Sequence, residues 1–192
     1  MRIGLFFGSF NPVHTGHLII AETALDEAKL DRVWFIVSPQ NPFKDKKTLL
    51  SEYDRLKMVE LGIGDNHRLF PSNIEFSLPK PSYTIDTLTH LFDKYRSYTF
   101  VLIMGEDNLL HLPKWKNHEA ILNHYPIYVY PRKGTTIETE LKNHPNVHYF
   151  EAPLLDISAT YIRTRLQSKK SIRYLTPEPV VSYIMSGRLF MD

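Results

Sequence analysis

The chain has 192 residues, of which 43% are hydrophobic, and its formal net charge is +2 at neutral pH. This length fits a single globular domain over residues 1–192, and the apolar fraction argues against a disordered chain. The charge is too small to favour a nucleic-acid surface, which needs clustered basic residues. The absence of cysteine excludes disulfides and thiolate chemistry. Since no apolar run suits a signal peptide or a membrane span, we expect a cytoplasmic protein.

The first half of the chain alternates short apolar runs with segments of helical periodicity. In chain order we expect strand 3–7, helix 17–29, strand 32–37, helix 51–63, one or two short strands within 68–78, and helix 84–95. Ser51 and Thr84 stand where a side-chain hydroxyl caps the first turn of a helix. The first three segments predict a βαβ unit with a right-handed crossover.

The second half continues this alternation. In chain order we expect strand 98–104, a short helix 117–122, strands 127–130 and 147–150, and helices 158–166 and 178–186. Ser158 stands at the N-cap position of the first of these last two helices. Strands alternating with helices predict an α/β fold, a doubly wound Rossmann-like parallel sheet of about six strands with C-terminal helices.

A loop bounded by Gly8 and Gly16 follows the first strand and leads into the first helix. Ligands of such sheets bind at the carboxyl ends of the strands, and a helix N-terminus attracts phosphate. The loop is neither a P-loop nor a GxGxxG fingerprint. It carries His14 and His17, whose imidazoles can donate hydrogen bonds to phosphate oxygens. They could also be ordinary polar loop residues, or metal ligands, although no third ligand or HExxH pattern supports a metal.

The decapeptide GSFNPVHTGH, residues 8–17, resembles the HxGH signature of the adenylyltransferase/cytidylyltransferase superfamily. The resemblance implies transfer of a nucleotidyl group, with His14 and His17 as the catalytic pair. It also implies that the loop binds ATP and touches the second substrate. The residues concerned are Gly8, Ser9 and Phe10 for ATP, and Asn11 for the acceptor. The motif alone leaves the acceptor open.

Four later segments resemble the bacterial nicotinate-nucleotide adenylyltransferase family. The first is NPFK, residues 41–44, in which Phe43 replaces a histidine common in the family. The resemblance makes Lys44 a phosphate contact for nicotinate mononucleotide, although a solvated lysine in a charged run is equally open. The second is PSYTIDTL, residues 81–88, which implies that Tyr83 and Thr84 face the pyridine nucleotide.

The third segment is GEDNL, residues 105–109, followed by LPKW, residues 112–115. The resemblance places Gly105 and Asp107 at ATP, with the Asp107 carboxylate accepting hydrogen bonds from ribose hydroxyls. It places Trp115 against the nicotinate ring by aromatic stacking, whereas the residue alone suggests core packing. Arg132 matches an arginine of the family and could contact the mononucleotide or be ordinary surface.

The fourth segment is ISATYIR, residues 157–163, close to a run shared across the superfamily. It implies that Ile157, Ser158 and Arg163 bind ATP, since a helix start and an arginine one turn later can both reach phosphate. The tail LTPEPV, residues 175–180, also resembles the family, but it carries no predicted chemistry.

The resemblance implies transfer of AMP from ATP to nicotinate mononucleotide, giving nicotinate adenine dinucleotide and pyrophosphate. The attacking phosphate has a second pKa of about 6 and needs no general base. We expect catalysis by positioning and charge stabilisation, with Mg²⁺ held by ATP phosphates and water rather than by a protein site. ATP and nicotinate mononucleotide are the expected partners, without nucleic acid or membrane, and a homo-oligomer stays open.

Four alternatives remain at this point. The chain could be another superfamily enzyme, such as a phosphopantetheine adenylyltransferase, although those chains lack segments like PSYT and the Trp115 region. It could prefer the amidated mononucleotide. It could be a nucleotide-binding protein without catalysis, or a fragment of a class I tRNA synthetase, which shares a HIGH-type motif.

Overall fold

The computed structural model describes residues 1–39, 49–131, 139–153 and 155–191. Within them lies one sheet of six parallel strands in the order β3-β2-β1-β4-β5-β6. The strands are β1 (Arg2–Gly8), β2 (Arg32–Val37), β3 (Leu69–Ser72), β4 (Thr99–Gly105), β5 (Ile127–Tyr130) and β6 (Val147–Tyr149). The order reverses between β1 and β4, which is the switch point where such sheets bind ligands.

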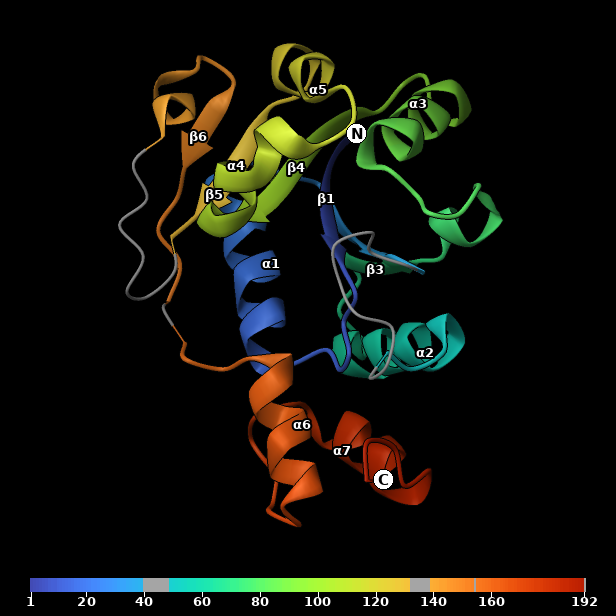
Figure 1. Cartoon of the computed structure of the whole chain (residues 1–192). Helices are drawn as coiled ribbons and strands as arrows, with labels where there is room; N and C mark the ends of the chain where they lie inside the picture. Colours follow the sequence, from blue (N-terminus) through green and yellow to red (C-terminus); the bar gives the residue numbers. More distant parts are fainter. Residues whose placement is uncertain (40–48, 132–138, 154, 192) are drawn as a thin grey trace.

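Helices cover both faces of this sheet (Figure 1). They are α1 (Thr15–Glu27), α2 (Glu52–Ile63), α3 (Thr84–Lys94), α4 (Glu106–His111), α5 (His118–His124), α6 (Ala159–Gln167) and α7 (Glu178–Ser186). Short 3₁₀ turns occur at Ile74–Ser77, Leu112–Lys114 and Glu140–Asn143. The core against one face draws on α1, α2, α6 and α7, and the core against the other draws on α3, α4 and α5. The expected doubly wound α/β fold is therefore confirmed.

The apolar runs predicted as strands form strands whose two faces are both buried. In β1, Ile3 and Leu5 enter one core and Phe6 enters the other, as the alternation of side chains along a strand requires. Gly4 faces the same core as Phe6, where an added Cβ would lie 2.6 Å from the Leu30 side chain. Burial on both sides explains why the strand sequences are continuously apolar rather than alternating.

Two of the three expected helix caps are confirmed. The Ser51 hydroxyl accepts the backbone N–H of Asp54 at 3.1 Å, and the Ser158 hydroxyl accepts that of Tyr161 at 3.1 Å. The prediction for Thr84 is wrong, because Tyr83 is the N-cap of α3 and its carbonyl accepts the backbone N–H of Asp86. Thr84 is the first helical residue instead.

The expectation of one or two short strands within 68–78 is met by the single strand β3, because the chain then turns at Asn73, whose carbonyl accepts the backbone N–H of Phe76 and opens the 3₁₀ turn. Helix α4 was not predicted, since its six residues follow β4 without a break and are too short to show a helical period. Among the described residues, no helix is both long and apolar enough to cross a membrane.

Candidate active site

The loop after β1 is shaped by Phe10, which has a positive φ of 45° and is 2% exposed. Its ring folds back under the loop, so a Cβ on Gly8 would lie 2.8 Å from it, closer than real contacts allow. The same ring meets the His17 ring edge-on at 5.1 Å. Phe10 was predicted to bind ATP, and its buried ring packs beneath His17.

His14 and His17 lie at the start of α1 with their rings stacked 3.7 Å apart. Gly16 makes this possible, because a Cβ there would lie 3.1 Å from Nδ1 of His14. The backbone N–H of His14 donates to Nδ1 of His17 at 3.3 Å. A neutral His17 with Nδ1 as acceptor carries its proton on Nε2, so it is a hydrogen-bond donor through that atom.

The C-terminal segments meet this loop. One guanidinium nitrogen of Arg163 donates to the carbonyl of Asn11 at 2.8 Å, and burial lowers the pKa of Arg163. The carbonyl of Ile157 lies 4.0 Å from the Cβ position of Gly16, and Ser158 caps α6 beside it. The structure thus brings the fourth predicted segment next to the histidine loop.

The tail also contributes, although no chemistry was predicted for it. The Thr176 hydroxyl is buried and donates to the carbonyl of Val13 at 2.9 Å. The backbone N–H of Thr15 donates to the carbonyl of Leu175 at 3.0 Å. Hydrogen bonds with Leu175 and Thr176 therefore fix the start of α1.

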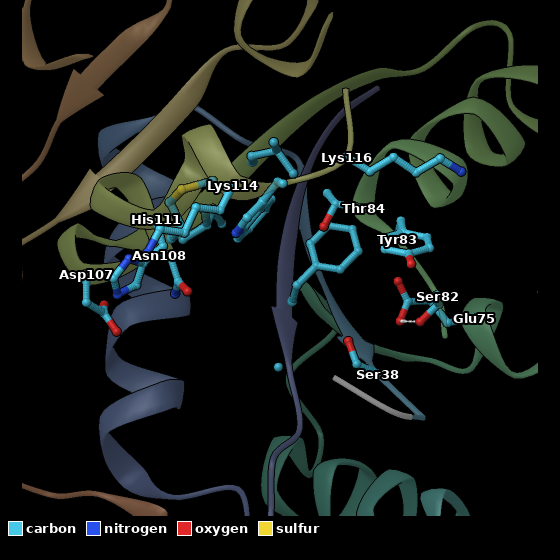
Figure 2. Close-up of a pocket in the computed structure, with 16 residues that line it drawn as sticks. Ser38, Glu75, Ser82, Tyr83, Thr84, Asp107, Asn108, His111, Lys114 and Lys116 are labelled. Carbon is cyan, nitrogen blue, oxygen red and sulfur yellow. Dashed lines mark hydrogen bonds between the residues drawn. The ribbon is translucent and has the colours of Figure 1, made fainter. Parts of the chain in front are cut away.

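A pocket of about 460 Å³ opens at the carboxyl ends of the strands (Figure 2). Five predicted site residues line it: Gly8, Tyr83, Thr84, Asp107 and Trp115. Figure 2 shows the labelled side chains in two groups. One holds Asp107, Asn108, His111 and Lys114, and the other holds Ser38, Glu75, Ser82, Tyr83, Thr84 and Lys116. Trp115 is half-buried at the wall, consistent with a ring available for stacking.

The other predicted residues within the described ranges do not line this pocket. Those around the start of α1 are Ser9, Phe10, Asn11, His14, His17, Ile157, Ser158 and Arg163, and Gly105 ends β4. Asn11 is 4% exposed, and its side-chain oxygen accepts the backbone N–H of Leu50 at 3.3 Å. Lys44 and Arg132, and also Phe43, lie outside the described residues.

Arg55 of α2 was not singled out from the sequence, although it is completely buried. Its guanidinium donates to the carbonyls of Ser9 at 2.8 Å and Ser38 at 2.7 Å. It also donates to Leu50 at 3.0 Å and Pro39 at 3.1 Å. Desolvation lowers its pKa, opposed by the charge of nearby Glu52. The residue joins the loop after β1 to the loop after β2.

Other residues missed by sequence reasoning line the pocket wall. They are Ser38, Glu75, Ser82, Asn108, His111, Lys114 and Lys116. Lys116 pairs with Asp86 at 2.9 Å and lies 4.9 Å from the centre of the Tyr83 ring. This contact fixes the turn after Trp115 to the first turn of α3. Their proximity in space reveals these residues, since they come from four separate stretches of the chain, namely residues 38, 75, 82 and 108–116.

The start of α4 is anchored by Glu106, which is 4% exposed. Its carboxylate pairs with Lys142 at 2.9 Å and accepts the hydroxyl hydrogen of Tyr149 at 3.4 Å. Desolvation first, and the charge of Glu106 second, raise the pKa of Tyr149 to about 12. This cluster ties α4, and with it Asp107, to β6.

Comparison with known proteins agrees with this geometry. Residues 5–165 match the cytidylyltransferase-like family. The "probable nicotinate-nucleotide adenylyltransferase" of Cytophaga hutchinsonii is 55% identical over 192 residues, all of both chains. The protein of that same description from Flavobacterium psychrophilum is 54% identical over 185 residues, 96% of each chain.

The chain belongs to the nicotinate-nucleotide adenylyltransferase family. A solved structure supports the fold across a much greater distance in sequence. It is the Plasmodium falciparum nicotinic acid mononucleotide adenylyltransferase complexed with NaAD, with a TM-score of 0.82 at 19% identity. The match covers 98% of this chain and 97% of that one.

Replacing Arg55 with Met should lower the free energy of unfolding by about 3 kcal/mol, because buried carbonyls lose their donor. Arg55→Lys keeps a cation that reaches fewer carbonyls, so its loss should be smaller. Urea denaturation measures both, with exposed Arg96→Met as the matched control. An Arg55→Met protein as stable as the control would contradict the bridging role.

Tyr149 predicts a dependence of stability on alkaline pH. An ordinary tyrosine pKa is about 10. Because the folded value is about 12, the native state keeps a proton that the unfolded chain releases. The resulting stability is complete below about pH 10 and is lost as pH rises toward 12.

Urea midpoints measured over this rising pH should therefore fall more steeply for the wild type than for Tyr149→Phe. Glu106→Gln removes the second cause of the shift and should give an intermediate slope. Equal slopes for all three proteins would show that the Tyr149 hydroxyl has no such linkage.

Proposed function

We propose that the protein transfers the adenylyl group of Mg²⁺–ATP to nicotinate mononucleotide. One observation carries the proposal. The loop after β1 leads into the histidine pair. Gly8 of that loop also lines the pocket that Tyr83, Thr84 and Trp115 line. Family membership supports the choice of acceptor. The Plasmodium falciparum enzyme, described as complexed with NaAD or APC, has this fold.

The ATP end of the site is the region around the start of α1. His17 donates from Nε2 to a phosphate oxygen, and His14 stacks beside it. The N-terminal N–H groups of α1 and α6 and the guanidinium of Arg163 add positive partial and full charges. Asp107, at the first turn of α4, accepts hydrogen bonds from ribose hydroxyls. These donors hold the triphosphate as charge develops on it.

The acceptor end is the part of the 460 Å³ pocket at Tyr83, Thr84 and Trp115, and a volume of this size is typical of small-molecule sites. Trp115 stacks on the pyridine ring, a contact that contributes about 0.5–1.5 kcal/mol beyond area burial. Tyr83 and Thr84 face the mononucleotide from the start of α3. Lys44 and Arg132 stay proposed phosphate or substrate contacts on the grounds of family resemblance.

The reaction needs positioning rather than acid–base chemistry. A phosphate oxygen of the mononucleotide forms a bond to the α-phosphorus of ATP, and the bond from that phosphorus to the bridging oxygen breaks. Pyrophosphate leaves with the electron pair. The nucleophile is already ionised at neutral pH, since its second pKa is about 6. Mg²⁺ enters with ATP as part of the substrate. Among the described residues, no group of three His, Asp or Glu side chains is arranged to hold a metal.

Incubation with Mg²⁺–ATP and nicotinate mononucleotide should release pyrophosphate and form nicotinate adenine dinucleotide, detected by chromatography. Parallel reactions with nicotinamide mononucleotide and with phosphopantetheine distinguish the acceptors. Chelation of Mg²⁺ should stop the reaction. No pyrophosphate with any acceptor would favour a nucleotide-binding protein over an enzyme.

Replacing His17 with Ala should lower kcat by about 10²–10³, the loss typical of removing one donor to a developing negative charge. The half-buried ring also packs against Phe10 and His14, so the thermal midpoint should fall as well, and turnover is compared at a temperature where both proteins are folded. His67→Ala, at an exposed turn between α2 and β3, is the matched control. Turnover like that of the wild type in a folded His17→Ala protein would remove this role.

We also expect residues 1–192 to act as a single domain in the cytoplasm. The two core clusters together include residues from β1 through α7, which supports one folding unit.

A further inference from the structure

Glu75 lies in the 3₁₀ turn Ile74–Ser77 and lines the pocket, although it is only 2% exposed. One carboxylate oxygen accepts the Thr87 hydroxyl hydrogen at 2.7 Å. The other accepts that of Ser82 at 2.8 Å (Figure 2). The Ser38 hydroxyl is a third donor. Desolvation raises the pKa of Glu75, and these three hydrogen bonds oppose the shift.

Burying a carboxylate costs desolvation free energy, which its hydrogen bonds to hydroxyl groups must offset. The three donors come from three segments: the end of β2, the loop before α3 and the first turn of α3. Ser38 and Ser82 themselves line the pocket, whereas Thr87 is buried behind it. Glu75 therefore joins the pieces of a pocket wall to which it also belongs.

Hydrogen bonds also connect this wall to the histidine loop. The carbonyl of Ser38 accepts a hydrogen bond from Arg55, which also holds the carbonyl of Ser9. Ser38 is thus fixed at its backbone by a buried cation and at its side chain by a buried carboxylate. A displacement of Glu75 would move Ser38, Ser82 and the start of α3 relative to the loop.

We propose that Glu75 is a positioning residue for the pyridine mononucleotide, setting the wall formed by Ser38, Ser82 and the first residues of α3. The inference rests on the proposed function of the pocket. Glu75 acts through the hydroxyls that it holds, so its loss impairs capture of the mononucleotide and leaves ATP binding and the transfer step largely intact.

Steady-state kinetics of three variants test this. Glu75→Met keeps the side-chain volume and removes the acceptors, so the KM for nicotinate mononucleotide should rise by about tenfold or more. Glu75→Gln keeps one carbonyl acceptor and should restore most of the affinity. Thr87→Val removes a donor that does not line the pocket, and a smaller rise of the same kind is expected. The KM for ATP and kcat should change by no more than about threefold.

The mononucleotide KM of the double variant Glu75→Met/Thr87→Val should be little higher than that of Glu75→Met, because both substitutions remove the same hydrogen bond between Thr87 and Glu75. Glu60→Gln, an exposed carboxylate on α2, is the matched control. Circular dichroism and thermal midpoints establish that each variant is folded at the assay temperature. If Glu75→Met does not fold, Thr87→Val carries the test, because a rise in its KM for the mononucleotide is expected whereas Glu75→Gln should resemble the wild type.

Calorimetric titration of nicotinate mononucleotide into each variant gives a readout besides activity. A mononucleotide KM and affinity unchanged in folded variants would overturn the inference, as would equal rises in KM for both substrates. Failure of the wild type itself to bind nicotinate mononucleotide or to form the dinucleotide would instead overturn the proposed function.

Discussion

The buried guanidinium of Arg55 is the interaction on which the arrangement of the site depends. Burying a cation is costly, and among the described residues its hydrogen-bond partners are backbone carbonyls rather than a carboxylate. The cost is offset only if the loops keep the positions that supply these acceptors. The loop after β1 and the loop after β2 are thereby fixed to α2 and to each other. Ser9 and Ser38 then occupy set positions at the switch point of the sheet.

From this frame the site divides into two parts that meet at Gly8. On one side, Phe10 supports the stacked histidines, and the C-terminal segments reach the same loop through Arg163 and Thr176. On the other side, the pocket is walled by α3, α4 and the end of β2. In the proposed reaction the first part holds the triphosphate and the second holds the acceptor. Chain segments distant in sequence therefore contribute to each substrate.

The sequence predicted what depends on local pattern. β2 and α7 have the expected bounds, and the histidine loop lies at the end of β1 as its glycines indicated. It could not predict Arg55 or Glu75, because charged residues near helices and turns are normally exposed and only tertiary contacts bury these two. The tail around Thr176 was missed for the same reason. Tyr83 rather than Thr84 caps α3, since the chain enters the helix one residue earlier than hydroxyl preference suggested.

The pocket also shows why net charge was a poor guide to the ligand. Lys114 and Lys116 line it, but so do Glu75 and Asp107, so the charges of these four residues balance. Lys116 is moreover paired with Asp86. Attraction of an anionic substrate by overall field is therefore weak. Selectivity must come from directed donors such as the helix N-termini and the histidine pair, whose geometry depends on the buried charges behind them. Arg55 and Glu75 are thus better understood as supports, Arg55 for the loop after β1 and Glu75 for the pocket wall, than as ligands themselves.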